Sequence, residues 1–198
     1  MRNINTGGRG AVRKHKEILA DVMRWTEQRR RGIIAIDGMC GSGKSFLARE
    51  IGEMLGIPVF HMDDYYLPFD RRPEDWLHIC AGNMDLHRME SEVLRQLSAG
   101  ETVHSYRYIC REDRREPHDE EPADFAVIEG TYSLHPQLRS YYDLRIFMTV
   151  SEREQMIRLR EREGSNYRNF LTKWIPMEKL YFQTMYPEEY ADIMVKNG

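Results

Sequence analysis

The sequence predicts an α/β fold with three layers (α/β/α), in which helices cover both faces of a five-stranded parallel sheet. Short continuous apolar runs, as in strands buried on both faces, alternate along the chain with longer segments of helical spacing. Such alternation predicts βαβ units, whose strands are parallel. The 198 residues are enough for one such domain and too few for two.

The expected elements follow from these two patterns. The apolar runs predict strands at residues 32–37, 58–62, 125–128, 144–150 and 192–195. Apolar residues three and four apart predict helices at residues 11–31, 45–55, 85–97, 151–162 and 166–185. Glycine favours helix C-termini, and serine followed three residues later by glutamate favours an N-terminal capping box. These signals are Gly56, Gly100 and the pair Ser151 and Glu154, while Pro176 predicts a kink.

The stretch between the second and third strands carries most of the loop signals. Residues 69–83 are rich in Pro, Asp and Arg and predict a loop or short helix. Residues 102–110 alternate weakly, as one arm of a hairpin would, whereas residues 111–122 are almost wholly charged and predict a mobile loop. We expect residues 64–124 to form an insertion within a single domain that spans residues 1–198.

Composition argues against several classes of function. The net charge is −3 and both signs are interspersed, so we expect neither a nucleic-acid nor a membrane partner. No apolar run approaches the roughly 20 residues of a membrane helix, and the basic start lacks the apolar stretch of a secretory signal. The three cysteines are irregularly spaced, which favours a reducing cytoplasm over a disulfide framework or a zinc site.

The segment from Gly38 to Ser45 carries the strongest signal. It reads GMCGSGKS, which matches the G-x-x-x-x-G-K-[ST] pattern of the phosphate-binding P-loop between a strand and a helix. Glycines let backbone N–H groups turn toward phosphate oxygens. We expect Lys44 to bridge the β- and γ-phosphates of ATP, and the Ser45 hydroxyl to bind Mg²⁺. The expected nucleotide-binding residues are Gly38, Gly41, Ser42, Gly43, Lys44 and Ser45.

Two carboxylates after the second strand favour a kinase among P-loop proteins. Asp63 and Asp64 are expected where the carboxyl ends of parallel strands open on the ligand site. A carboxylate there accepts the proton of an attacking hydroxyl, although either residue can instead cap the next turn. The strand register decides which of the two is the base. The sequence also lacks the Asn-Lys-x-Asp element by which GTPases read guanine.

Arginines are frequent in the helix predicted after the fourth strand. Two of them, Arg158 and Arg162, are four residues apart and therefore share one face. Folded over the phosphates, these guanidinium groups would stabilise the transferring phosphoryl group, which makes residues 151–170 a candidate lid. The alternative is a solvated helix with weak pairs between these arginines and the interspersed glutamates. The four arginines are Arg153, Arg158, Arg160 and Arg162.

Several strand ends resemble those of the uridine kinase family. Besides the P-loop, they are HMDDYY at residues 61–66, VIEG at residues 127–130, YYDLRIF at residues 141–147 and YAD at residues 190–192. The chain is similar in particular to short bacterial uridine kinase-like proteins, which share Glu-Gly-(Thr/Ser)-Tyr-Ser-Leu-His-Pro and Trp-Ile-Pro-Met-Glu. The resemblance covers most of the chain, from Gly32 to Val195.

The resemblance implies transfer of a phosphoryl group from ATP to the 5′-hydroxyl of a ribonucleoside such as uridine or cytidine. It implies that Asp63 is the general base and that Tyr66 lies at the substrate. Glu129 stands where the family keeps an acidic residue near magnesium. Arg158 and Arg162 stand where it keeps the lid arginines.

The acceptor side departs from the family pattern. Asp85 falls near the family's ribose-binding aspartate when a one-residue gap is allowed. The family's Pro-x-Tyr-Asp element, which helps to hold the base, reads SYRYI at residues 105–109, and Tyr108 either stacks on the acceptor's ring or packs in the core. Ile109 replaces the family's aspartate, and Asp113 stands near the place of its base-recognising histidine.

Other candidates are predicted to be structural. We expect Trp76 and Trp174 to pack rather than to form ligand platforms. We expect His61 to lie inside the strand as a satisfied histidine, either in the core or behind a residue that contacts the ligand. Cys40 has no evident base partner in the P-loop, so we expect a small filler rather than a nucleophile.

The sequence thus predicts an ATP- and Mg²⁺-dependent kinase for a nucleoside-like small molecule. We expect the chain to form a single P-loop kinase domain over residues 1–198, in which residues 64–124 are the substrate-binding insertion. Nicotinamide riboside, a pantothenate-like alcohol or a sugar phosphate are alternative acceptors. A sugar phosphate would need a basic cluster, for which Arg107, Arg111, Arg114 and Arg115 are candidates. The alternative from another class is a non-catalytic nucleotide-binding regulator, and a homo-oligomer is left open.

Overall fold

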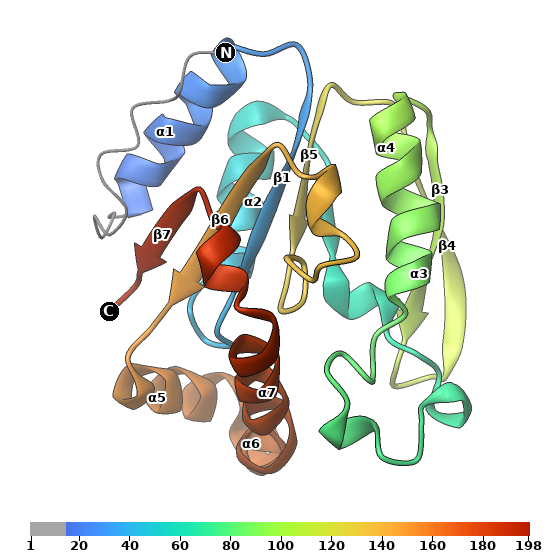
Figure 1. Ribbon diagram of the computed structural model, residues 1–198, viewed down its shortest axis with the longest axis vertical. Helices are drawn as coiled ribbons and strands as arrows, with labels where there is room; N and C mark the ends of the chain where they lie inside the picture. Colours follow the sequence, from blue (N-terminus) through green and yellow to red (C-terminus); the bar gives the residue numbers. More distant parts are fainter. Residues whose placement is uncertain (1–14) are drawn as a thin grey trace.

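The structure, a computed structural model, describes residues 15–198. Its centre is a sheet of five parallel strands in the order β2-β5-β1-β6-β7 (Figure 1). Since later strands are added on both sides of β1, the winding reverses there, and such a reversal leaves a crevice at the carboxyl ends of the strands. All five predicted strands are confirmed: β1 (Gly32–Gly38), β2 (Val59–His61), β5 (Phe125–Glu129), β6 (Leu144–Thr149) and β7 (Ile193–Lys196).

Two helices cover one face of the sheet. α1 (His15–Glu27) and α2 (Lys44–Leu55) pack their apolar side chains against Ile34 and Ile36 of β1. The first four residues of the predicted N-terminal helix, 11–14, lie outside the described residues.

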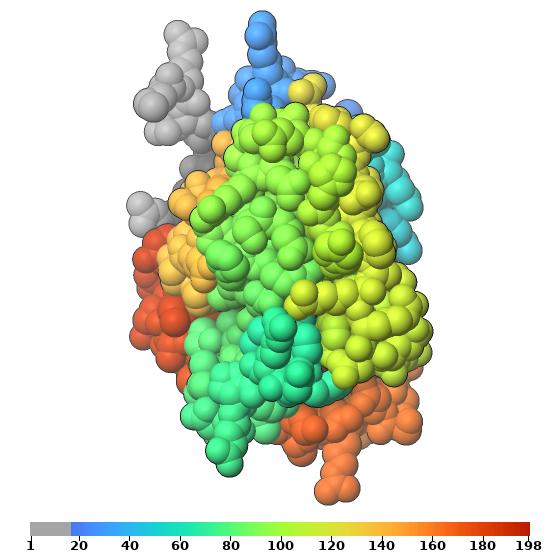
Figure 2. Space-filling model, turned by 90° about the vertical axis from the view of Figure 1, so that its right-hand side faces the viewer, coloured from blue at the N-terminus to red at the C-terminus, as the bar shows by residue number. Residues whose placement is uncertain are grey.

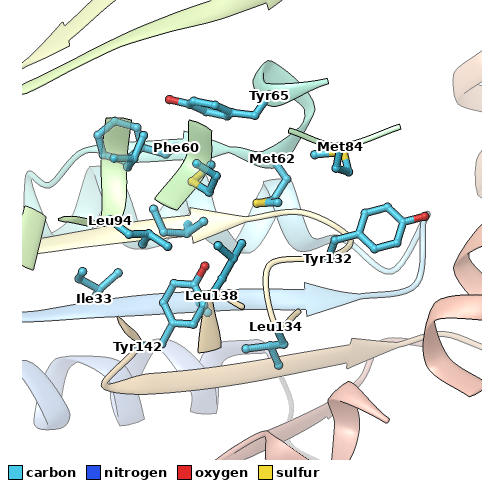
Figure 3. Packing of buried hydrophobic residues seen from close by; sticks show 14 of the residues in the cluster. Ile33, Phe60, Met62, Tyr65, Met84, Leu94, Tyr132, Leu134, Leu138 and Tyr142 are labelled. Atoms are coloured by element: carbon cyan, nitrogen blue, oxygen red, sulfur yellow. The ribbon is translucent and has the colours of Figure 1, made fainter. Parts of the chain in front are cut away.

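The opposite face is covered by a helix over residues 86–99 and by α7 (Ile175–Met185) (Figure 1). The first of these joins α3 (Leu86–Arg88), a π-helical stretch (Met89–Leu94) and α4 (Arg95–Ala99) without a break. Figure 3 shows the apolar side chains buried in this layer. The three-layer prediction is therefore confirmed. Among residues 15–198, no helix has the length and apolar character needed to span a membrane.

The predicted helix ends are largely confirmed. Gly56 and Gly100 follow their helices with φ of 63° and 74°, the left-handed conformation that ends a helix. The Ser151 hydroxyl accepts the Glu154 N–H at 3.3 Å and caps α5 (Glu152–Glu163). The second bond of a capping box is replaced, because the Glu154 carboxylate pairs with Arg158 on the next turn.

The helical segment before α7 is irregular, as Pro176 predicts. α6 (Tyr167–Asn169) continues into a π-helical stretch (Phe170–Trp174) that ends just before the proline. Proline has no N–H to donate to the preceding turn, and a wider turn relieves that mismatch.

The prediction of a mobile loop at residues 111–122 is wrong. β3 (Val103–Ile109), the predicted hairpin arm, pairs antiparallel with β4 (Arg114–Glu120). The inward side chains of β4 are polar, so apolar alternation does not reveal it. The strand is held by contacts of His118 with β3: Arg107 donates to the His118 ring, and the Ser105 hydroxyl donates to the His118 carbonyl. Figure 2 shows this hairpin beside the helix over residues 86–99.

Residues 62–84 lie below the helix over residues 86–99 in Figure 2 and contain the short 3₁₀ turns Phe69–Arg71 and Trp76–His78. The prediction of a loop or short helix at residues 69–83 is therefore confirmed.

Candidate active site

A cavity of about 290 Å³ lies at the carboxyl end of the sheet. In Figure 1 the strands run downward, and α5 to α7 lie below their ends. The wall combines the P-loop, the segments that follow β2 and β5, and the helices of the 151–185 region. Its residues are Cys40, Gly41, Gly43, Lys44, Ser45, Phe46, Asp63, Tyr66, Asn83, Glu129, Gly130, Thr131, Tyr132, Arg162, Phe170, Trp174 and Glu178.

The P-loop is shaped by glycines at both ends. A Cβ on Gly38 would lie 2.0 Å from the Met148 carbonyl oxygen, so only glycine fits between β1 and β6. Gly43 has a φ of 93° and turns the chain into α2, which begins at Lys44. The first-turn amides of a helix have no partner within it and carry the positive end of its dipole. Anionic oxygens are therefore favoured at this end of the cavity.

The Lys44 ammonium lies within the loop itself. Its Nζ donates to the carbonyl oxygens of Gly38 at 2.8 Å and Met39 at 2.9 Å. Lys44 and Ser45 both border the cavity, as the P-loop pattern predicts. Gly38 and Ser42 support the loop from behind, and the Ser42 carbonyl accepts a hydrogen bond from Asn197 at 2.8 Å.

A buried carboxylate, that of Glu178 on α7, accepts a hydrogen bond from one backbone amide of the P-loop. Its Oε2 accepts the Cys40 N–H at 2.5 Å, and its Oε1 accepts the Gln155 side-chain amide at 3.3 Å. Burial raises the pKa of Glu178, and the Lys44 charge opposes that rise. A carboxylate bonded to this amide indicates that the loop suits anionic oxygen, as a phosphate site must. The sequence analysis missed Glu178, although a lone acidic residue among Ile175, Met177 and Tyr181 was the available signal.

The Cys40 thiol is in a protected position. The Gln155 amide donates to both the carbonyl oxygen and the Sγ of Cys40, at 3.0 and 3.3 Å. Burial and the neighbouring Glu178 charge raise the pKa of Cys40 to about 12. The thiol is therefore protonated at neutral pH, which supports the prediction of a filler.

The two carboxylates after β2 point to different surroundings. Asp63 borders the cavity and accepts a hydrogen bond from the Tyr66 hydroxyl at 2.7 Å. Asp64 is not part of the cavity wall and lies 3.3 Å from the Arg107 guanidinium. Desolvation of the Asp63 carboxylate by the surrounding protein raises its pKa above the usual 3.8, and the negative charge of Glu129 adds to this rise. The hydrogen bond from Tyr66 and the positive charge of Lys44 oppose it. Asp63 is the carboxylate in position to meet a ligand.

Glu129, at the end of β5, faces the cavity beside the P-loop. Its Oε1 is hydrogen-bonded to Nδ1 of His61 at 2.6 Å, and this bond raises the pKa of His61. His61 thus lies behind a carboxylate of the cavity wall, and its ring has a hydrogen-bond partner, as predicted. Within residues 15–198, no group of three or more His, Cys, Asp or Glu side chains forms a metal cage. Ser45 and Glu129 nevertheless offer the hard oxygen ligands that suit Mg²⁺, which commonly completes its shell with phosphates and water.

The two predicted lid arginines differ in position. Arg162 borders the cavity, pairs with Glu163 at 2.6 Å and lies over the Phe170 ring. Arg158 is not in the cavity wall; it pairs with Glu154 and donates to the Gly41 carbonyl at 3.2 Å. Arg162 therefore reaches the cavity directly, whereas Arg158 contacts the P-loop backbone.

Aromatic rings form part of the cavity wall. Tyr66 stacks on Trp174 with 6.3 Å between ring centroids, and Trp174 contacts Trp76 at 5.8 Å. The guanidinium of Arg72 lies 5.1 Å from the Trp76 ring and 5.9 Å from the Tyr66 ring. Both tryptophans pack as predicted, and Trp174 also borders the cavity.

Two predicted substrate residues lie outside the cavity wall. Asp85 caps α3, where its carboxylate accepts the Arg88 N–H at 3.2 Å. Tyr108 is buried in the hairpin and its hydroxyl donates to Asp113. Besides Glu178, the sequence analysis assigned no role in the site to the wall residues Phe46, Asn83, Thr131, Tyr132 and Phe170.

Solved structures with this fold include the following three. A possible uridine kinase from Bacillus stearothermophilus superposes with a TM-score of 0.69, 21% identity, and coverage of 92% of this chain and 100% of the other. A putative fructose transport system kinase from Silicibacter sp. TM1040 superposes with a TM-score of 0.60, 20% identity, and coverage of 92% and 98%. The protein YGR205w gives 0.52 and 16%, with coverage of 91% and 92%.

A match to one protein-family model shows the family of the chain. No curated protein matches the chain. The model of the Phosphoribulokinase / Uridine kinase family matches residues 33–169, more than half of the sequence, and that stretch contains the P-loop, Asp63 and Glu129. The chain therefore belongs to the Phosphoribulokinase / Uridine kinase family of P-loop kinases.

Proposed function

We propose that this kinase moves the γ-phosphoryl group of ATP to a hydroxyl of a nucleoside-like small molecule. The observation that carries the proposal is that the P-loop and the carboxylate of Asp63 border one cavity. A phosphoryl donor and an alcohol held at these two positions are next to each other, and such positioning supplies much of the acceleration in kinases.

The nucleotide end of the cavity is the P-loop. Lys44 and the backbone amides at the start of α2 would hold the β- and γ-phosphates. Ser45 and Glu129 would hold Mg²⁺, which when bound neutralises phosphate charge. Arg162, with Arg158 behind the loop, would add positive charge as part of a lid over residues 151–170.

The acceptor end centres on Asp63. Its raised pKa keeps the carboxylate a useful base, and the acceptor hydroxyl would give its proton to the oxygen that is free of the Tyr66 bond. The aromatic side chains of Tyr66, Phe170 and Trp174 in the cavity wall favour an acceptor whose hydroxyl is attached to a flat or apolar group, as in a nucleoside. The segment 64–124 supplies Tyr66 and Asn83 to this wall and fits the substrate-binding insertion.

The hairpin arginines do not favour a sugar phosphate. Arg107 pairs with Asp64, and Arg114 pairs with Glu112 and Glu116. Neither they nor Arg111 and Arg115 border the cavity. The hairpin arginines therefore do not supply the positive charge that a dianionic acceptor would need, which favours a neutral alcohol.

The test is a panel assay with the full chain. ATP and Mg²⁺ are combined with nucleosides, nicotinamide riboside, pantothenate and sugar phosphates, and each product is identified by its mass. We expect one nucleoside-like compound to stimulate ATP consumption and to gain one phosphoryl group. Stimulation by a sugar phosphate alone would contradict the acceptor class, and tight ATP binding without any turnover would favour the non-catalytic regulator.

A further inference from the structure

The turn after β5 holds a tyrosine in an unusual backbone conformation. Tyr132 has a φ of 80°, in the left-handed region that bulky residues avoid. Two backbone hydrogen bonds fix the turn, from Ser133 N to Gly130 O at 3.2 Å and from His135 N to Tyr132 O at 3.0 Å. Strained residues of this kind cluster at active sites, where the surrounding structure imposes them.

The ring of Tyr132 is clamped. Its centroid lies 4.9 Å from that of Tyr181, and the residue is only 6% exposed. The Tyr181 hydroxyl and the Leu134 N–H both donate to Oδ2 of Asp37, at 2.7 and 2.8 Å, which anchors Tyr181 and the turn that carries Tyr132 to β1. Figure 3 shows the Tyr132 ring directed toward the end of β1 that leads into the P-loop, away from the other labelled side chains.

The Tyr132 hydroxyl is the polar end of this rigid group. Tyr132 borders the cavity together with Lys44 and Asp63, and its hydroxyl bonds to no side chain or backbone group within residues 15–198. Tyr142, in the same core cluster, also has an unpartnered hydroxyl, but that oxygen is sealed from solvent. Burial raises the pKa of Tyr132, so its hydroxyl is a neutral donor at every pH at which a kinase works.

We propose that Tyr132 is a further catalytic residue, whose hydroxyl donates a hydrogen bond to an oxygen of the phosphoryl group in transfer. The inference rests on the proposed function. In that step the bond from the γ-phosphorus to the bridging oxygen of ADP breaks, and a bond from the acceptor oxygen to phosphorus forms. The acceptor proton moves to Asp63, while the Tyr132 proton stays on its own oxygen. A fixed donor needs no rearrangement as charge shifts in the transition state, which is how such groups accelerate transfer.

The experiment compares wild type, Tyr132→Phe and Tyr142→Phe. Each full chain is titrated with ADP and Mg²⁺, with and without aluminium fluoride, whose planar anion resembles a phosphoryl group in transfer. ATP hydrolysis with water as the acceptor is the second readout. For Tyr132→Phe we expect unchanged ADP affinity, a loss of about tenfold or more in aluminium fluoride-dependent affinity, and hydrolysis slowed by a similar factor. Tyr142→Phe should match wild type in all three measurements.

The possible failures are distinguishable. Wild-type values for Tyr132→Phe in the aluminium fluoride titration and in hydrolysis would overturn the inference and leave the proposed function intact. An equal loss of ADP affinity in both states would assign Tyr132 a structural role and would also overturn it. A wild-type protein that neither hydrolyses ATP nor gains affinity with aluminium fluoride, and whose ATP consumption no acceptor of the panel stimulates, would contradict the proposed function, and the inference with it.

Discussion

The hydroxyl of Tyr66 donates a hydrogen bond to Oδ1 of Asp63 across 2.7 Å. The bond favours the ionised carboxylate and so lowers the pKa of Asp63, whereas desolvation by the surrounding protein raises it. The same tyrosine stacks on Trp174 at the edge of the cavity. Tyr66 therefore links the proposed base to the proposed acceptor wall, and its hydroxyl and its ring have separable effects.

Removal of that hydroxyl should move the pH profile. In Tyr66→Phe the pKa of Asp63 rises further, because one of the effects that lowers it is gone. A base must be ionised to act, so the acidic limb of the kcat/KM profile should shift to higher pH while the plateau falls by about tenfold or less. Tyr108→Phe, which breaks a Tyr–Asp bond outside the cavity, is the matched control. Superimposable acidic limbs for wild type and Tyr66→Phe would contradict the assignment.

The adjacent aspartates offer a direct test of the base. Asp63→Asn should lower kcat by about 10²- to 10⁴-fold, the usual contribution of general base catalysis. ADP affinity, measured by titration calorimetry, should stay near that of wild type, since Asp63 is not part of the P-loop. Asp64→Asn removes the same charge one residue away, where it pairs with Arg107, and should retain most of the turnover. If the two variants lose turnover equally, Asp63 has no special role.

Much of the fold could be predicted because local patterns specify it. The strands are apolar runs buried on both faces, and the P-loop is a contiguous motif whose function depends mainly on its own backbone. The same reasoning put Asp63 at the carboxyl end of β2. The residues alone could not decide which of Asp63 and Asp64 is the base. That choice depends on Arg107, which lies on the hairpin and pairs with Asp64.

The elements that the sequence analysis missed depend on long-range contacts. β4 is a strand because β3 pairs with it, although Glu116, His118 and Glu120 give it no apolar face. Glu178 reaches the P-loop from 138 residues away along the chain, and no local pattern reports that contact. The left-handed conformation of Tyr132 is likewise imposed by its surroundings rather than by its own preference.

The contact between Glu178 and Cys40 predicts a change in nucleotide affinity. A carboxylate on the loop repels the phosphates that the loop binds, whereas an amide can still accept the Cys40 N–H. Glu178→Gln should therefore bind ADP about tenfold more tightly, which corresponds to about 1.4 kcal/mol. Glu152→Gln makes the same change of net charge at an exposed site paired with Lys179, and should leave ADP affinity unchanged. Weaker ADP binding by Glu178→Gln would instead indicate that the carboxylate is needed to shape the loop.

Asp37, buried at the end of β1, predicts how stability depends on pH. Its carboxylate accepts hydrogen bonds from Gly38, Leu134 and Tyr181, but burial outweighs them and raises its pKa from 3.8 to about 6. Between these values the folded protein holds a proton that the unfolded chain has lost, so this group's contribution to stability falls as the pH rises. A shift of this size corresponds to about 3 kcal/mol. Urea unfolding should therefore show the advantage of wild type over Asp37→Asn shrinking from pH 4 toward pH 7 by about that amount. A stability difference that stays constant across this range would mean that Asp37 is ionised in the folded protein at low pH, as a carboxylate fully compensated by its three donors would be.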